Sequence, residues 1–231
     1  MKRYLYIALL SLIGLMLRAE VPSPKHEIRA VWLTTIYGLD WPQKPATTEY
    51  GRKMQQQELC QILDRLKEAN FNMVFVQVRM RGDVIYKSAI EPASKTFSGK
   101  YGVMPGYDPL AFVIEECHKR GMELHAWINP YRAKTKTTSV LASSHIANTN
   151  PERVFKYDDQ YILNPGQPEN REYICKIATD ITRRYDIDGF HIDDYFYPYP
   201  APGQTIQDDK EFQKYNNGIK DRGDWRRYNV N

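Results

Sequence analysis

The sequence has few cysteines, and no pattern organises them. Cys60, Cys117 and Cys175 are the only three, and they lie far apart. An odd, widely spaced set predicts neither a disulfide framework nor a CxxC metal pair. Each lies among the apolar residues of an expected helix, which favours small buried thiols over a redox role.

Clusters of basic residues and closely spaced histidines are also absent. The net charge is +4, and Lys2, Arg3 and Arg18 account for most of it. No run of five basic residues follows, so we expect no nucleic-acid partner. No HxH or HxxxH pair occurs among the five histidines. The sequence therefore predicts neither a metal site nor a cofactor.

An apolar run at residues 4–17 follows Lys2 and Arg3 and precedes the small residue Ala19. This order is typical of a secretory signal peptide covering residues 1–19. The run is short for a membrane span, although an uncleaved anchor is the alternative. We therefore expect an exported protein of the periplasm, cell envelope or medium, with no stable membrane span after cleavage.

Residues 26–231 read as repeated strand–helix units. Strand patterns occur at residues 28–35, 72–79, 122–129 and 187–193, and helical patterns at about 52–69, 108–120 and 168–184. Asp108 is the expected N-cap of the second helix, and Gly121 ends it. Short joints precede the strands and long loops follow them, which predicts a (β/α)8 TIM barrel, an α/β fold.

Two alternatives to a barrel are open. A doubly wound open sheet usually has a GxGxxG turn after its first strand, and residues 34–40 do not match it. Residues 130–167 form an insertion with an expected hairpin at 154–163, and residues 224–231 look like the start of a fourth helix. About four units are half of a barrel, so we expect a truncated N-terminal half. A self-contained four-stranded domain is the other possibility.

Polar side chains fall on one face of the expected strands. Strand side chains alternate between faces, so placing Val74, Val76 and Val78 against the helices turns the residues between them inward. The first strand can be phased either way, with Trp32 and Thr34 or with Val31 and Thr35 inward. The predicted interior residues are Gln77, Arg79, His125, Trp127, Asn129, His191 and Asp193.

Barrel interiors are mostly branched and apolar, so this polarity predicts a site for a polyhydroxylated ligand. Asp193 ends its strand and is the candidate nucleophile, with Asp194 beside it in a supporting role. Arg79 is expected to hold Asp193 ionised. Tyrosine rings can stack on sugars. The loops add further candidate substrate-binding residues: Asp83, Tyr86, Tyr131, Arg132 and Tyr195.

Five segments in order resemble the glycosyl hydrolase-like 10 family, formerly DUF187. They are RAVWLTT (29–35), VQVR with the following GD (76–83), HAWINPYR (125–132), LNPG (163–166) and DGFHIDDYFYP (188–198). The resemblance implies a TIM-barrel glycoside hydrolase of the bacterial envelope, with peptidoglycan glycan strands as a candidate substrate. It also implies similarity to α-amylase-like enzymes, whose nucleophile matches Asp193. His191 departs from that pattern, which has an arginine there.

In the enzymes of this resemblance, the general acid follows strand five, which lies beyond this chain. We therefore expect an Asp-nucleophile retaining hydrolase on O-glycosidic bonds, largely inactive as this chain alone. One alternative is a half barrel that binds glycan without cleaving it. Another is a metal-dependent hydrolase that uses His125, His191 and Asp193, which the absence of an HxH pair disfavours.

Overall fold

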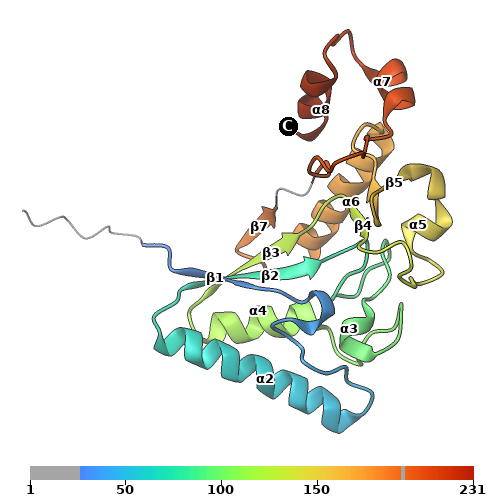
Figure 1. The fold of residues 1–231 in the computed structure, drawn as a ribbon. Coiled ribbons are helices and arrows are strands. Elements are labelled where there is room, and N and C mark those ends of the chain that lie inside the picture. Colours follow the sequence, from blue (N-terminus) through green and yellow to red (C-terminus); the bar gives the residue numbers. More distant parts are fainter. Residues whose placement is uncertain (1–26, 194–195) are drawn as a thin grey trace, which may run out of the picture.

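The computed structural model describes residues 27–193 and 196–231, which form an α/β fold around one parallel sheet. The four strands lie in the order β1-β2-β3-β7, and each is paired in parallel with its neighbour (Figure 1). Their bounds are Ala30–Leu33 (β1), Met73–Arg79 (β2), Glu123–Ile128 (β3) and Gly189–Ile192 (β7). All four fall within the predicted ranges, and the parallel order confirms an α/β sheet.

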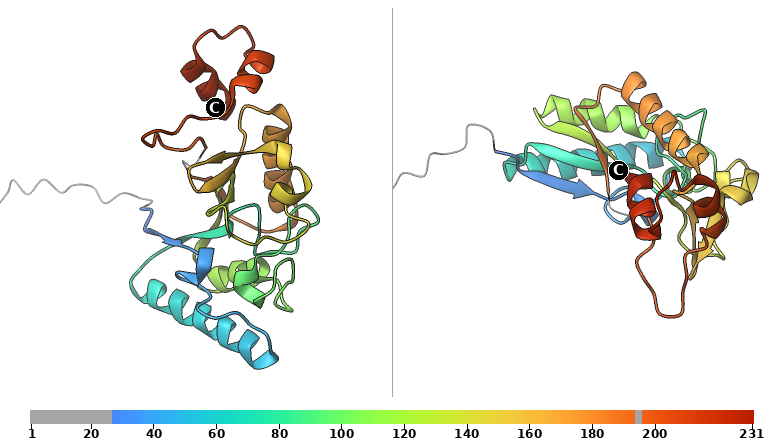
Figure 2. Two further views of the ribbon diagram at one scale, coloured as in Figure 1. Left: turned by 45° about the vertical axis from the view of Figure 1, so that its right-hand side comes forward. Right: turned by 90° about the horizontal axis from the view of Figure 1, so that it is seen from above.

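Three helices cover one face of this sheet: α2 (Glu49–Glu68), α4 (Pro109–Lys119) and α6 (Pro168–Arg184) (Figures 1 and 2). The alternate residues of the two central strands are fully buried against them, as the valine pattern predicted. These residues are Val74, Val76, Val78, Leu124, Ala126 and Ile128. The other face of the sheet carries the polar and aromatic side chains described below.

The helix starts follow from local sequence. The Thr48 hydroxyl accepts a hydrogen bond from Gly51 N at 3.1 Å and caps α2. The Asp108 carboxylate accepts one from Ala111 N at 3.1 Å and caps α4, with Pro109 in the first helical position. Caps of this kind contribute about 1 kcal/mol each. They fix where each helix begins and hence the length of the loop that precedes it.

The insertion after β3 forms a second, antiparallel sheet in the order β4-β6-β5. The predicted hairpin is confirmed as β5 (Val154–Tyr157) and β6 (Gln160–Leu163). The sequence did not predict β4 (Arg132–Lys134), because three residues carry too little periodicity. The remaining elements are short: η1 (Ile36–Gly38), α3 (Lys95–Ser98), α5 (Ile146–Thr149), η2 (Pro151–Arg153), α7 (Asp209–Tyr215) and α8 (Arg222–Val230).

Some expectations lie outside the described residues, and one was wrong. The signal peptide at residues 1–19 belongs to the part of the chain that the structure does not describe. Within residues 27–193 and 196–231, no helix has the length and apolarity to cross a membrane. Cys117 is buried as expected, but Cys60 is only partly buried and Cys175 is exposed.

Candidate functional site

An aromatic layer covers the interior face of the sheet, opposite the helices. The Trp32 ring stacks on Phe75, with centroids 4.7 Å apart, and meets Trp127 edge-on at 4.7 Å and His191 at 4.6 Å. These contacts settle the phase of the first strand, because they place Trp32 on the same face as Trp127 and His191. Trp32 is 45% exposed and offers a ring surface at this face.

A chain of hydrogen bonds crosses the carboxyl ends of the four strands. The Gln77 side-chain oxygen accepts from Thr35 N at 3.1 Å and from Ile36 N at 2.9 Å. Its amide nitrogen donates to the Asn129 side-chain oxygen at 2.6 Å. This fixes the Asn129 amide group so that its nitrogen donates to Asp193 Oδ2. A fully buried network thus orients one donor toward the candidate nucleophile.

Asp193 receives a second hydrogen bond from Trp127 Nε1 at 3.2 Å. Both donors are neutral, and both come from the neighbouring strand end. Hydrogen bonds donated to a carboxylate stabilise its ionised form. The side chain is only partly buried at the carboxyl edge of the sheet, so the two hydrogen bonds orient this carboxylate at an accessible position. We call Trp127, Asn129, His191 and Asp193 the interior-face site.

His191 precedes Asp193 by two residues and therefore lies on the same face of the sheet. Burial and the neighbouring His125 lower the pKa of His191 below its ordinary value of 6.5, and Asp193 opposes that shift. His125 lies lower still, in register with Gly189, where its ring packs on Phe75 at 5.1 Å. The predicted convergence of Gln77, His125, Trp127, Asn129, His191 and Asp193 on one face is therefore present in the structure.

Arg79 departs from the expected arrangement. The pairing of β2 with β3 slips between Gln77 and Arg79, so that Gln77 lies opposite Trp127 but Arg79 opposite Ile128. Such a bulge inserts one residue and turns those after it to the other face. Arg79 therefore lies on the helix side with Ile128, and its carboxylate partner is Glu91 rather than Asp193.

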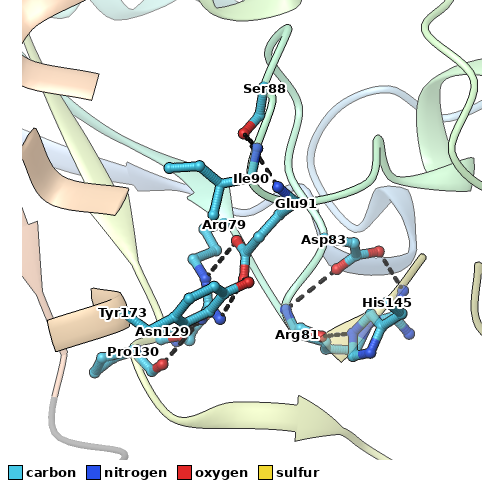
Figure 3. Close-up of polar contacts among 10 residues, drawn as sticks. All are labelled: Arg79, Arg81, Asp83, Ser88, Ile90, Glu91, Asn129, Pro130, His145 and Tyr173. Atoms are coloured by element: carbon cyan, nitrogen blue, oxygen red, sulfur yellow. Dashed lines mark hydrogen bonds and ion pairs between the residues drawn. The ribbon is translucent and has the colours of Figure 1, made fainter. Parts of the chain in front are cut away.

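The ion pair of Arg79 and Glu91 is bidentate, with N···O distances of 2.7 Å, and neither side chain is more than 1% exposed (Figure 3). Tyr173 of α6 donates to Glu91 at 2.9 Å. Burial disfavours the charged guanidinium, but the Glu91 carboxylate and its hydrogen bonds prevail and raise the pKa of Arg79. We call Arg79, Glu91 and Tyr173 the helix-side cluster.

The helix-side cluster acts on the interior-face site through the backbone. Arg79 Nη1 donates to the Asn129 carbonyl, and to the Pro130 carbonyl at 3.1 Å (Figure 3). The main chain of Asn129 is thus held from the helix side, and its side chain from the interior side by Gln77. Arg79 therefore positions a donor to Asp193 and does not itself pair with that carboxylate.

Asp83, a predicted substrate-binding residue, pairs with another residue of the protein. It forms an ion pair with Arg81 at 3.1 Å, and both are about 4% exposed (Figure 3). His145 Nε2 bonds the Arg81 carbonyl at 2.6 Å, while its Nδ1 accepts from Ala147 N at 3.0 Å. That pattern fits a neutral imidazole, and burial lowers the pKa of His145. This group of residues ties the loop after β2 to the insertion.

The other predicted loop residues divide into three cases. Tyr86 is 1% exposed and packs against Tyr185, so it belongs to the core. Tyr131 is 5% exposed, and its ring lies 6.0 Å from Phe196. Arg132 lines a cleft between the antiparallel sheet and residues 196–201. Asp194 and Tyr195 lie outside the described residues.

The sequence did not identify Glu91 as part of this arrangement, and it offered Thr35 only in one of two possible inward pairs of the first strand. Glu91 lies in a long loop with no pattern that points toward Arg79. The Thr35 hydroxyl donates to the Gln77 carbonyl at 2.6 Å, so Thr35 belongs to the network that holds Gln77. In the part of the chain that the structure describes, no group of three His, Cys, Asp or Glu side chains could hold a metal ion.

A parallel sheet with helices on one face and a carboxylate at its carboxyl edge is the arrangement found in glycosidase TIM barrels. The fold resembles α-L-fucosidase isoenzyme 2 from Paenibacillus thiaminolyticus, with a TM-score of 0.57 over 89% of this chain and 28% of that chain, at 14% identity. The chain belongs to the glycosyl hydrolase-like 10 family, whose model matches residues 27–231.

Two curated relatives support this assignment. The chain is 42% identical to glycosyl hydrolase YngK from Bacillus subtilis (strain 168), over 89% of this chain and 40% of that protein. It is 36% identical to glycosyl hydrolase DigH from Escherichia coli (strain K12), over 92% of this chain and 51% of that protein. The chain therefore spans about half, or less, of the length of these relatives.

Proposed function

We propose that the chain is the nucleophile-bearing part of a retaining glycoside hydrolase, with Asp193 as the nucleophile. The observation that carries this proposal is the Asp193 carboxylate, which two fixed, neutral donors, Trp127 Nε1 and Asn129 Nδ2, hold at the edge of the sheet. In such a reaction, the carboxylate attacks the anomeric carbon and forms a covalent glycosyl intermediate. The leaving oxygen takes a proton from a second carboxylic acid, about 5–5.5 Å from the first.

The proposal assigns that acid to a later strand of the barrel, as the resemblance to α-amylase-like enzymes implies. On this view, the four parallel strands form the N-terminal half of an eight-stranded barrel. The partial coverage of both curated relatives is consistent with this. The 231-residue chain alone would then bind glycan but turn it over little or not at all.

The proposed substrate is an envelope or extracellular glycan, with peptidoglycan glycan strands as the first candidate. Trp32 and Trp127 offer ring faces on which the C–H face of a sugar can stack. The predicted export signal at residues 1–19 agrees with a substrate outside the cytoplasm.

The experiment replaces by Asn the residue that aligns with Asp193 in full-length YngK and measures reducing ends released from purified glycan strands. We expect turnover to fall by roughly a thousandfold or more, while binding of the strands persists. The matched control replaces the residue that aligns with Asp186, an exposed carboxylate just before the start of the same strand. Unchanged hydrolysis in the Asp193-equivalent variant would remove the nucleophile assignment.

A further inference from the structure

A cleft lies between the antiparallel sheet and residues 196–201. Its volume is about 290 Å³, at the lower end of the range of roughly 300–1,000 Å³ for small-molecule sites. That size suits one ring-sized group. The lining side chains used below are Arg132, Tyr157, Gln160, Phe196 and Tyr199. We call this feature the aromatic cleft.

The walls of the aromatic cleft are fixed before any ligand arrives. The Tyr157 hydroxyl donates to the Tyr199 carbonyl at 3.0 Å and accepts from Ala201 N at 2.9 Å. One tyrosine of β5 therefore holds the loop at two points. Pro198 and Pro200 restrict the backbone between and beside those points. A preformed wall lowers the entropy lost on binding.

The chemistry of the lining is that of a sugar subsite. Phe196, Tyr157 and Tyr199 supply aromatic surface, and Tyr199 is 61% exposed at the rim. Arg132 and Gln160 supply polar groups along the same wall, with Asp158 at the edge. Aromatic surface with a few polar groups is typical of sites for a ring that is apolar on its faces and polar at its edge.

The position of the aromatic cleft links it to Asp193. Arg132 follows Asn129 by three residues, and Phe196 follows Asp193 by three residues. Three extended residues span at most about 10 Å. Both walls of the cleft are therefore anchored to the strand ends that hold the candidate nucleophile, so one oligosaccharide can occupy both places.

We propose that the aromatic cleft is a remote subsite that binds one pyranose ring of the glycan whose scissile bond lies at Asp193. The ring stacks on Tyr199 and turns a hydrogen-bond-accepting substituent toward Arg132. This inference rests on the proposed function, because it takes the same glycan chain as ligand. It adds that a subsite away from the reacting bond makes binding depend on the length of the glycan.

The test compares the binding of N-acetylglucosamine oligomers with two and six residues to the purified chain by calorimetry. We expect the hexamer to bind more tightly than the dimer, because it alone reaches both the interior-face site and the cleft. Tyr199→Ala should weaken hexamer binding by about 5- to 10-fold and leave dimer binding unchanged. Tyr199→Trp should retain hexamer affinity, since it keeps a stacking ring.

Tyr50→Ala is the matched control, because Tyr50 is also a well-exposed tyrosine and lies on α2, on the helix-covered side. It should bind both oligomers like the parent chain. Equal losses for dimer and hexamer in Tyr199→Ala, no loss for either, or no binding of either oligomer to the parent chain would overturn the cleft proposal. None of these results tests the assignment of the nucleophile. That assignment is tested by hydrolysis in the Asp193-equivalent variant of YngK.

Discussion

Arg79 and Asp193 both lie where parallel strands end, but on opposite faces of the sheet. In the helix-side cluster, Arg79 is fully buried and Glu91 receives hydrogen bonds from both Arg79 and Tyr173. In the interior-face site, Asp193 is partly buried and held by two neutral donors. A charge whose partners are all internal contributes to stability and position. A charge held at an accessible edge is placed for a ligand.

The largest expected effect breaks the helix-side cluster. Glu91→Gln removes the carboxylate and leaves the Arg79 charge buried without a counter-ion. Breaking one side of a buried pair costs about 3–5 kcal/mol, so we expect the free energy of unfolding, measured with urea, to fall by that amount. Replacing both partners, in Arg79→Met with Glu91→Leu, should cost less than the single change, because no unpaired charge remains.

Glu115→Gln is the matched control, because it removes a carboxylate of similar chemistry from an exposed pair with Lys119. Screening by water makes such pairs contribute little, so its unfolding curve should overlay that of the parent chain. If Glu91→Gln also overlaid the parent curve, the contrast between the two faces would not hold.

The second-largest expected effect comes from close packing between Gly189 and His125 on the interior face. A Cβ added at Gly189 would lie 2.3 Å from two ring atoms of His125. Overpacking of this kind typically costs about 1–3 kcal/mol, so Gly189→Ala should lower the unfolding free energy by that amount. His125→Ala in the same chain removes the clashing ring, and the double variant should recover stability relative to Gly189→Ala. Additive losses would show that the ring is not the cause.

The sequence predicted the four parallel strands and the three long helices well because each carried its own local signal. Asp108 with Pro109 marked the start of α4, and the alternating valines of β2 marked the helix-facing side. The same alternation correctly predicted that Gln77, Trp127, Asn129 and Asp193 would share a face. Strand periodicity is a local property, so it serves wherever the pairing stays regular.

What failed was the prediction that depended on regular pairing. Alternation assigned Arg79 to the interior, but the bulge after Gln77 reverses the faces. Nothing in VQVR reports a bulge, because it is set by how β2 pairs with β3. Glu91 was missed for a related reason, since its partner is chosen by tertiary packing of a long loop. Trp32 needed its neighbours on the next strands before its face could be known.

The smallest expected effect is a pH dependence of stability that comes from His191 on the interior face. The pKa of His191 lies below 6.5, so the folded state binds fewer protons there than the unfolded state. Its contribution to stability is therefore full above about pH 6.5 and is lost as the pH falls toward the folded pKa. NMR titration should show the His191 pKa dropping further in Asp193→Asn, where an attracting charge is gone. It should rise in His125→Asn, where a repelling one is gone.

Arg79 stays charged throughout this range, so a loss from Glu91→Gln should be present at both pH 5.5 and pH 7.5, with a small difference because Glu91 also acts on the pKa of His145. A loss seen at only one of these pH values would contradict its assignment to the buried Arg79 charge.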